Sequence, residues 1–542
     1  MPKHDWKPYF PYAEARPEQV TAINEILDTF EAGKKFFVLE AQTGVGKSAI
    51  GVTVSRYMAA HVTPAAPYVP GATILTTQKL LQDQYERDFA KAAMVSLKSS
   101  SNYQCKHHTK QTCADTRPLL EHEPKGSKMW NTCMLNCTYK KKKEEFVTGN
   151  LGVTNFAYFL NETKFSGKIP KKQLLIIDES HNLPEELSKF IEVSFSEKFA
   201  KSFLDLTLPE GLTPRKTVEW IQNEYYPVLL AKKKAFEDGM AKYTDLAEKV
   251  KSGEFSKLTR KMDLLSGHET KVNIFLGLWD PDNWLMEEIP ADEKAGRKFQ
   301  FKPIDISPYA ESYIHNWGEF VLFMSATILD VPGFRTLCGI KEEKCSFQII
   351  PSPFPVENHP IIYAGVGSMG NNEIESTLPK LVDAVKEILK AHKDEKGIIH
   401  CGSYKIAWYI KKNIKSSRLL IHDSSDREEV LRKHMSSKDP TVLLSPSMTE
   451  GVDLKDDLSR FQVICKIPFP YLGDKLVRKK MSKWEWWYDL QTAKTLIQSV
   501  GRSVRNENDK AVTYILDSIW ERFYGKNKRI FPENFKKGNL SK

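Results

Sequence analysis

Long apolar runs, low-complexity tracts and internal repeats are missing from this chain of 542 residues. No stretch approaches the roughly 18 uninterrupted apolar residues of a membrane span. An apolar signal core is also missing from Met1 to Trp6, so we expect an intracellular protein with no membrane association. The composition, 41% hydrophobic and 27% charged, excludes a disordered chain and a collagen-like one.

Cysteine is scarce, with 8 residues in the whole chain. That number is too small for a disulfide scaffold, and in a reducing compartment a local group of cysteines points to metal or redox chemistry. Acidic charge is also in deficit, because 79 Lys and Arg face 69 Asp and Glu, a net charge of +10. The excess favours a polyanionic partner, although net charge bears on binding and not on fold.

Short, continuous apolar runs recur along the chain, and each precedes a segment with helical spacing. Continuous runs are typical of strands that are buried on both faces, so the alternation predicts an α/β fold with parallel sheets covered by helices. The runs lie at residues 36–39, 72–75, 174–177, 321–324, 397–400, 442–444 and 463–465.

Two regions interrupt this alternation. Residues 103–149 hold four of the cysteines, and residues 190–315 are rich in Lys and Glu with helical spacing. Apolar runs resume after each region, so we interpret both as insertions into a first α/β unit, since the chain is too long for one hydrophobic core. The predicted first unit comprises residues 1–102, 150–189 and 316–332, and the second comprises residues 333–542.

A phosphate-binding loop follows the first apolar run. Residues 40–48 read EAQTGVGKS, which fits the P-loop pattern with alanine in place of the first glycine. Backbone N–H groups at Gly44 and Gly46 would surround phosphate oxygens, Lys47 would reach the β- and γ-phosphates, and Ser48 would bind magnesium. Thr43 belongs to the same nucleotide-binding set. The alternative, a chance Gly-rich turn, is disfavoured because strand, loop and helix follow in the required order.

A pair of acids lies at the end of the apolar run 174–177. Asp178 is predicted to be the second magnesium ligand, and Glu179 to orient or deprotonate the attacking water. Acidic residues are also common at helix N-termini for purely structural reasons. The P-loop upstream favours the functional interpretation.

These motifs resemble those of superfamily 2 helicases of the DEAH type, with Ser180 where the motif name has alanine. Four further segments share the resemblance: RPEQ at 16–19 is similar to an adenine-sensing motif, MSAT at 324–327 to the S-A-T motif, EGVDL at 450–454 to the fifth helicase motif and QSVGRSVR at 498–505 to the sixth. The resemblance implies nucleotide contacts by Arg16, Gln19, Gly451 and Asp453, and catalytic roles for His181, Gln498, Arg502 and Arg505.

The position of the paired arginines has a physical reason. Charge that develops on a transferred phosphoryl group needs cations, and these can arrive when two domains close. Arg502 and Arg505 belong to the second α/β unit, far in sequence from Lys47. We therefore expect ATP to bind in a cleft whose closure is tied to hydrolysis. The alternative for the arginines is a solvated basic helix face.

Four cysteines within 33 residues could surround one metal centre: Cys105, Cys113, Cys133 and Cys137. Zinc sites prefer pairs separated by two to four residues, and the Cys133–Cys137 pair alone has that spacing. Four cysteines also suit a four-iron, four-sulfur cluster. Spacing by itself leaves zinc and iron–sulfur open.

The resemblance to the iron–sulfur helicases of the XPD/DinG family favours iron. That family carries four cysteines at this point, an arch insertion between the DEAH and S-A-T motifs, a segment similar to VTNFAY at 153–158 and another similar to IPFP at 467–470. It implies two RecA-like motor domains, the first interrupted by a cluster domain at 103–149 and a mainly helical arch at 190–315. A 4Fe–4S cluster held by the four cysteines is implied by the resemblance, although not by their spacing.

The remaining cysteines and the neighbouring histidines have simpler interpretations. Cys401 and Cys465 lie in apolar runs and are predicted to be buried small hydrophobes. Cys338 and Cys345 are predicted to be free thiols. His107 and His108, which could compete as ligands, are expected to be exposed.

A translocating helicase holds backbone phosphates through cations and hydroxyls, and bases through aromatic rings. Candidate DNA contacts are Thr76 to Gln78, Lys140 to Lys143 and Ser403 to Lys405. The lysine run is equally typical of a solvated surface. Trp484, Trp486 and Trp487 could stack on bases, but a helix packed on the second sheet is favoured.

The resemblance implies an ATP-dependent DNA helicase that requires ATP and Mg²⁺. It implies movement with 5′→3′ polarity on single-stranded DNA, with forked or tailed duplexes as substrates in repair or replication. We expect a monomer. Two other functions share part of the sequence pattern: an ATP-driven translocase that does not unwind, and a DNA-binding subunit without catalytic activity.

Overall fold

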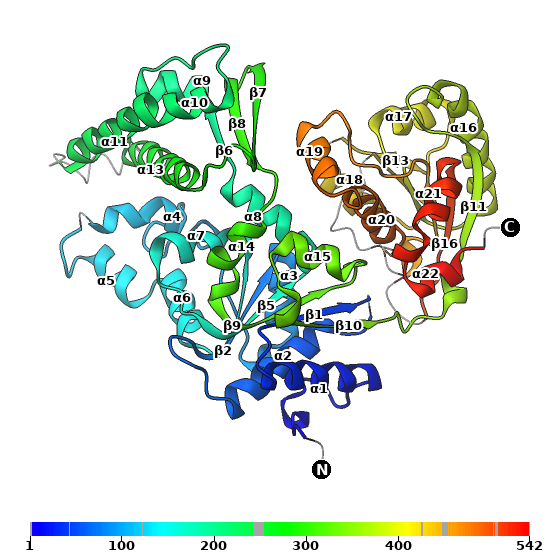
Figure 1. Cartoon of the computed structure of the whole chain (residues 1–542), viewed down its shortest axis with the longest axis horizontal. Helices are drawn as coiled ribbons and strands as arrows, with labels where there is room; N and C mark the ends of the chain where they lie inside the picture. The colour runs from blue at the N-terminus through cyan, green and yellow to red at the C-terminus, as the bar shows by residue number, and fades with distance from the viewer. Residues whose placement is uncertain are drawn as a thin grey trace.

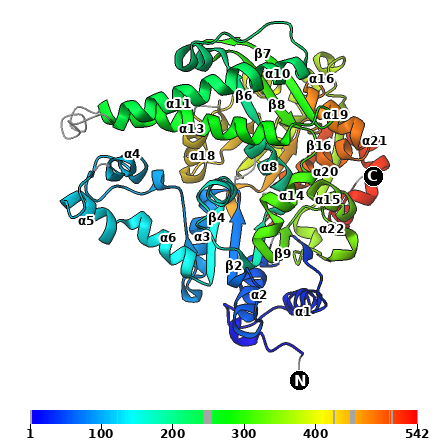
Figure 2. The same ribbon diagram turned by 60° about the vertical axis from the view of Figure 1, so that its left-hand side comes forward.

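The computed structural model describes the chain except for residues 1–2, 43, 122, 242–253, 424–425, 447–453, 455, 502, 505–507 and 541–542. Two parallel sheets form the centres of two motor domains, which lie at the lower middle and the right of Figure 1. A helical arch and a smaller cysteine-containing segment project from the first of them (Figures 1 and 2).

The first sheet has seven strands in the order β10-β1-β9-β5-β2-β4-β3, and every pairing is parallel. This confirms the predicted parallel sheet, and all four apolar runs predicted in this half are strands. The strands are β1 (Phe36–Ala41), β2 (Val69–Thr76), β3 (Val95–Ser96), β4 (Leu151–Asn155), β5 (Lys172–Asp178), β9 (Gly318–Ser325) and β10 (Cys345–Ile350).

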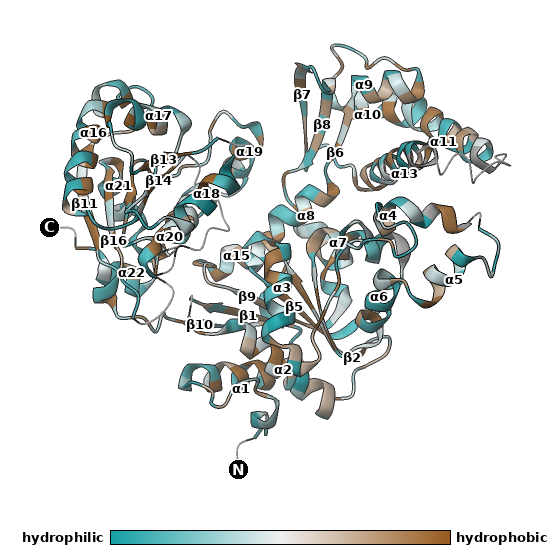
Figure 3. Ribbon diagram, turned by 180° about the vertical axis from the view of Figure 1, so that it is seen from behind, coloured by the Kyte–Doolittle hydropathy of each residue, from teal (hydrophilic) through white to brown (hydrophobic). Residues whose placement is uncertain are grey.

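Helices cover both faces of this sheet. Alternate residues of β1 show the two faces, because Phe36 and Val38 pack with α7, α8, α14 and α15, whereas Phe37 and Leu39 pack with α1 and α2. In Figure 3 strands such as β5 and β9 are drawn mostly brown, as apolar strands between two helical layers. The helices are α1 (Pro17–Glu31), α2 (Lys47–His61), α3 (Lys79–Asp88), α7 (Phe156–Asn161), α8 (Leu183–Ile191), α14 (Ser307–Tyr313) and α15 (Val331–Cys338).

The first motor domain extends further along the chain than expected. Strand β10 pairs with β1, so this domain reaches Ile350 and the predicted boundary at residue 332 is wrong. The physical reason is that β10 is an edge strand whose interior residues are half-buried or exposed, so it has no continuous apolar run to mark it.

The second sheet is also entirely parallel, with six strands in the order β11-β16-β15-β12-β14-β13. Helices α16 and α17 pack on one face, and α20 and α21 on the other. The elements are β11 (Ile361–Gly367), α16 (Ile374–Ala391), β12 (Gly397–His400), α17 (Tyr404–Asn413), β13 (Leu419–Ile421), α18 (Arg427–Ser436), β14 (Val442–Ser445), β15 (Phe461–Ile464), α19 (Lys475–Lys483), α20 (Trp487–Val500), β16 (Val512–Asp517), α21 (Ile519–Asn527) and α22 (Glu533–Gly538).

The two inserted regions form separate projections from the first domain (Figure 2). The arch is mainly helical, but it also contains a three-stranded antiparallel sheet that the sequence analysis did not predict. Its elements are β6 (Val193–Ser196), α9 (Glu197–Phe199), α10 (Pro214–Trp220), α11 (Tyr226–Ala241), α13 (Glu254–Leu278), β7 (Trp284–Asp292) and β8 (Gly296–Pro303), and the cysteine segment contains α4 (Cys113–Thr116), α5 (Lys128–Leu135) and α6 (Thr138–Thr148).

Among the helices that the structure describes, none combines the length and the apolar content needed to cross a bilayer.

A buried carboxyl group, Glu40, connects two neighbouring strands of the first sheet. Both of its oxygens accept from the backbone N–H of Leu329, at 3.2 and 3.1 Å, so the end of β1 holds the loop that follows β9. The side chain is 4% exposed, and burial raises its pKa to about 7 although the backbone donors act in the opposite direction.

We predict that Glu40→Gln makes the first motor domain more stable at pH 8 than the parent. Because the pKa of Glu40 is raised, the folded state binds its proton more tightly than the unfolded chain does. The contribution of Glu40 to the free energy of unfolding is therefore fully present below pH 4.5 and is lost as the pH rises through about 7. The full shift corresponds to about 3 kcal/mol. Thermal unfolding at several pH values measures the difference, with the exposed Glu25→Gln as control; parallel curves for Glu40→Gln and parent would contradict it.

Candidate functional site: a nucleotide cleft and a cysteine group

The P-loop has the backbone that its glycines predict. Gly44 has φ +91° and Gly46 has φ +83°, and Gly46 caps helix α2. A Cβ atom on Gly44 would lie 2.1 Å from the ring of Phe354, and one on Gly46 would lie 2.5 Å from Gln19 Nε2. Both the conformation and the packing therefore require glycine at these two positions.

Two residues predicted to contact adenine hold the loop itself. Arg16 Nη1 donates to Gly44 O at 2.5 Å, and Gln19 Nε2 donates to Val45 O at 2.8 Å. Lys47 Nζ donates to Ala41 O at 3.0 Å, inside the same loop. The loop is therefore supported from the N-terminal helix α1.

The second motor domain also contacts the P-loop, through residues that the sequence analysis missed. Gln42 and Asn534, on helix α22, exchange two amide hydrogen bonds of 3.0 and 2.7 Å. Phe354, in the segment that joins the two domains, packs its ring on Gly44. No sequence signal marks these contacts, because Gln42 and Asn534 are 492 positions apart.

Asp178 ends strand β5 and is buried. Its Oδ1 accepts from Glu179 N at 3.0 Å, and its Oδ2 accepts from the hydroxyl of Tyr85 at 2.8 Å. Burial, followed by the charge of Glu179, raises the pKa of Asp178 to about 6, against the opposing effects of Lys47 and Tyr85. A cation bound beside this group would favour the carboxylate form. Tyr85 is a further residue that the sequence analysis did not single out.

Glu179 has a backbone conformation that is unusual for its type. Its φ of +51° places it in the left-handed region, where a residue with a Cβ atom is strained. Its Oε2 lies 3.4 Å from His181 Nδ1, and a third of its side chain is exposed. Strained backbone of this kind is typical of functional sites, which fits the predicted catalytic role of Glu179.

A hydrogen-bonded network joins three predicted motifs across the two domains. Gln498 Nε2, on helix α20, donates to His181 Nε2 at 2.8 Å and to Thr327 Oγ1 at 3.1 Å. His181 Nδ1 then donates to Ser325 Oγ at 2.7 Å, because the other ring nitrogen already accepts a hydrogen bond from Gln498 and the neutral ring carries its proton on Nδ1. The structure thus unites residues from the ends of β5 and β9 with the second domain.

Five predicted site residues lie outside the described residues: Thr43, Gly451, Asp453, Arg502 and Arg505. Their roles remain predictions. Helix α20 ends at Val500, two positions before the first of the two predicted arginines in the sequence.

The four cysteines lie within one small region. An antiparallel bridge between Gln104 and Thr112 brings Cys105 close to Cys113, which explains how a seven-residue spacing can serve one centre. The sulfurs of Cys113 and Cys137 are 3.9 Å apart. Burial, and then the other three thiols, raise the pKa of Cys113 to about 12. Burial, and then Cys105 and Cys137, also raise the pKa of Cys133. A donor set of four mutually interacting sulfurs suits a metal centre, because a metal would stabilise the thiolates.

The other sulfur and imidazole predictions have mixed outcomes. Cys401 and Cys465 are fully buried, as predicted. Cys338 and Cys345 are free thiols. The predicted exposure of His107 and His108 is wrong, since both are half-buried and their rings lie 4.7 Å apart.

The candidate DNA contacts are partly occupied within the chain. Lys142 pairs with Glu86 at 2.9 Å and Lys143 pairs with Glu162 at 2.5 Å, whereas Lys140 approaches Met134 Sδ. Lys405 pairs with Glu375, and Ser403 caps helix α17. Trp487 is buried, as favoured for a packed helix, and lines with Trp484 a pocket between the domains beside His181.

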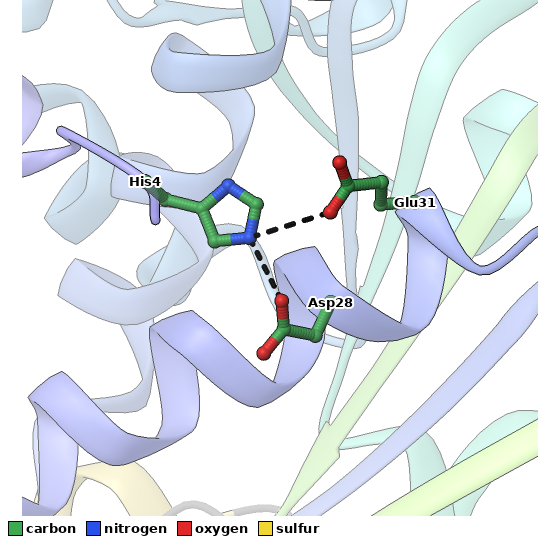
Figure 4. Close-up of side chains that lie close together, drawn as sticks. All are labelled: His4, Asp28 and Glu31. Carbon is green, nitrogen blue, oxygen red and sulfur yellow. Dashed lines mark hydrogen bonds and ion pairs between the residues drawn. The ribbon is translucent and has the colours of Figure 1, made fainter. Parts of the chain in front are cut away.

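A second group of metal-type ligands, His4, Asp28 and Glu31, lies on the outer side of helix α1 (Figure 4). The His4 ring nitrogen lies 3.0 Å from Asp28 and 3.8 Å from Glu31. The ammonium group of Lys3 contacts the same two carboxylates at 2.6 and 2.7 Å. Since a lysine already neutralises this group, we assign no metal to it.

Known proteins resemble the chain over almost its whole length. A family model described as "Helicase C-terminal domain" matches residues 385–538, and one described as "Type III restriction enzyme, res subunit" matches residues 12–207. The ATP-dependent DNA helicase YoaA of Haemophilus influenzae is 23% identical, covering 94% of this chain and 92% of that protein. The ATP-dependent DNA helicase DinG of Photobacterium profundum is 21% identical, covering 91% of each.

Solved structures show the same fold. An XPD helicase superposes with a TM-score of 0.64 at 16% identity, covering 98% of this chain and 100% of that one. An apo XPD structure has a TM-score of 0.60 at 17% identity and covers 97% and 99% of the two chains.

We predict that Gln498→Ala lowers kcat for ATP hydrolysis roughly 10- to 100-fold. The change removes two hydrogen bonds, each worth about 1 kcal/mol, between the domains. The KM for ATP should change less than about threefold, because the P-loop belongs to the first domain. Steady-state kinetics with Gln491→Ala, on the same helix, as control test this; a raised KM with unchanged kcat would assign Gln498 to nucleotide binding instead.

Proposed function

Since the chain belongs to the XPD/DinG type of superfamily 2 helicases, we propose that it uses ATP hydrolysis to move along single-stranded DNA and to separate duplex strands. The finer parts of the proposal are 5′→3′ polarity, a task in repair or replication, action as a monomer inside the cell, and forked or tailed duplexes as substrates.

The observation that carries this proposal is the network centred on Gln498. Its amide is the group through which the second domain contacts both His181 and Thr327. His181 neighbours the acids at the end of β5, and Thr327 belongs to the loop held by Glu40. A displacement of the second domain therefore changes hydrogen bonds next to the place where phosphoryl transfer would occur. An ATP-driven motor requires such a connection between domain movement and hydrolysis.

Each polar group of the cleft has one task in this proposal. Lys47 and the N–H groups of the P-loop bind the β- and γ-phosphates, and Glu179 orients or deprotonates the attacking water. Magnesium held by Ser48 and Asp178 would neutralise charge on the phosphate oxygens. On closure Arg502 and Arg505 face the γ-phosphate, and after hydrolysis the cleft reopens.

A 4Fe–4S cluster bound by Cys105, Cys113, Cys133 and Cys137 is part of the proposal. Within the described residues no three of these sulfurs lie within 4.8 Å of one another. A zinc tetrahedron with bonds of about 2.3 Å would place all its sulfurs about 3.8 Å apart. The 3.9 Å between the sulfurs of Cys113 and Cys137 fits one such edge, but no third sulfur of the described residues completes the set, so the choice of a cluster rests on the resemblance to iron–sulfur helicases and not on these distances.

The cluster segment and the arch contact each other. Arg260, on α13 of the arch, lies 3.4 Å from Asp115, on α4 beside Cys113. This exposed pair is weak by itself, so the contact can open and close at small cost. We propose that the two projections together guide one DNA strand and exclude its complement.

A directional unwinding assay tests the function. On partial duplexes with a 5′ or a 3′ single-stranded tail, we expect ATP-dependent strand release from the 5′-tailed substrate. Lys47→Ala should abolish release, because the ammonium group that reaches the phosphates is lost. Hydrolysis stimulated by DNA without strand release would instead indicate a translocase that does not unwind. ATP turnover unaffected by Lys47→Ala would show that the ATP site is elsewhere.

We predict that Cys113→Ser removes most of the bound iron and the visible absorbance of anaerobically purified protein, since one of four ligands is lost. Strand release should fall more than ATP hydrolysis, because the cysteines lie outside the ATP cleft. Cys345→Ser, at a free thiol in strand β10, is the matched control and should retain the iron. One equivalent of zinc without iron in the parent protein would contradict the cluster.

A further inference from the structure

Helix α3 places a buried phenol beside the predicted magnesium ligands. Tyr85 is 3% exposed, and its hydroxyl donates to Asp178 Oδ2 at 2.8 Å. Ser48, the P-loop residue assigned to magnesium, is near enough to act on the same phenol. One neutral donor therefore binds the carboxylate and neighbours the P-loop hydroxyl, which are the two groups assigned to magnesium.

The carboxylate of Asp178 is fixed from two sides. Its Oδ1 accepts from Glu179 N, within its own strand end, and its Oδ2 accepts from Tyr85, which comes from a different element 93 positions away. With only the first bond, the carboxylate could rotate about its χ2 torsion, which is broad for aspartate. The phenol removes that freedom and leaves further lone pairs of both oxygens for a metal or its water.

Several hydrogen bonds hold helix α3 in place and so fix the position of the Tyr85 side chain. Gln82 donates to Leu97 O at 3.0 Å and accepts from Asn155 at 3.1 Å, Lys79 donates to Asn102 at 2.8 Å, and Glu86 pairs with Lys142 at 2.9 Å. These bonds connect the helix to three other segments of the first domain and of the cysteine region. A positioning group requires such a supporting shell.

We propose that Tyr85 is a positioning residue of the magnesium site, whose hydroxyl orients Asp178 toward the cation bound with the nucleotide. The proposal rests on the ATPase function proposed above. Tyr85 does not touch the reacting atoms; it acts through Asp178, as outer partners of metal ligands do elsewhere, where their loss weakens metal binding about 10- to 100-fold.

A purely structural role is the competing interpretation, because the ring of Tyr85 also belongs to the core and lies 5.7 Å from that of Phe89. Tyr85→Phe separates the two, since it keeps the ring and removes only the hydroxyl. Tyr225→Phe is a matched control: Tyr225 is fully buried, and its hydroxyl makes a 2.8 Å hydrogen bond to His268 in the arch, away from the cleft.

The test measures ADP binding by calorimetry on the full-length protein at increasing Mg²⁺ concentrations. For Tyr85→Phe we expect the Mg²⁺ concentration that gives half of the magnesium-dependent gain in affinity to rise about 10-fold. Affinity for ADP in EDTA should stay within about twofold of the parent, and kcat for ATP should recover at excess Mg²⁺. Tyr225→Phe should behave as the parent in every measurement.

A double-mutant cycle with Asp178→Asn checks that the effect passes through the carboxylate. In that background Tyr85→Phe should add no further shift in Mg²⁺ dependence. A second replacement, Tyr85→Leu, should reproduce the shift, and it serves if the phenylalanine protein does not fold.

Three results would overturn the assignment: a Mg²⁺ dependence of Tyr85→Phe within about twofold of the parent, an equal loss of ADP affinity with and without Mg²⁺, or a full additional shift in the Asp178→Asn background. Failure of the ATPase function is distinguishable, because the parent protein itself would then show no magnesium-dependent ADP binding.

Discussion

The hydrogen bonds of Gln498 to His181 and Thr327 are the contacts on which the arrangement of the cleft depends. Each motor domain has its own hydrophobic clusters, and few residues of one domain belong to those of the other. The domains meet through polar contacts, including the amide pair of Gln42 with Asn534, and through a few apolar ones, such as Leu329 against the cluster of the second domain. A neutral hydrogen bond contributes about 1 kcal/mol, far less than a core, so the interface can break and re-form while both domains stay folded.

The strands that the sequence predicted are those buried on both faces. A strand such as β5, with every residue buried, needs a continuous apolar run and is visible for that reason. Strand β10 and the arch strand β7 each have an exposed or half-exposed face, so polar residues dilute the pattern. The missed domain boundary and the missed arch sheet thus have one physical cause, since partial burial imposes weaker constraints on residue type.

The site residues that spacing predicted are those whose position depends on the conformation of the neighbouring backbone. Gly44 and Gly46 must adopt positive φ, and Asp178 must follow a buried strand, so spacing along the chain identifies them. Tyr85 and Asn534 have no such local requirement. Their positions relative to Asp178 and Gln42 arise from the packing of helices α3 and α22, and a tyrosine or asparagine on a helix is common for other reasons. Residues that contact a motif only through tertiary packing therefore leave no pattern in a single sequence.

The strand order explains how distant motifs come to share one site. In a parallel sheet all carboxyl ends lie at one edge, and here β9 lies between β1 and β5. Glu40 of β1 binds the loop after β9 on one side, and on the other side His181, which follows β5, is hydrogen-bonded to Ser325 at the end of β9. Any displacement of this loop must therefore alter hydrogen bonds next to the P-loop and next to the acids together. Gln498 donates to both Thr327 and His181, so the second domain contacts the first beside β9, the strand that lies between β1 and β5. A movement of the second domain can therefore change the hydrogen bonds at the ends of all three strands.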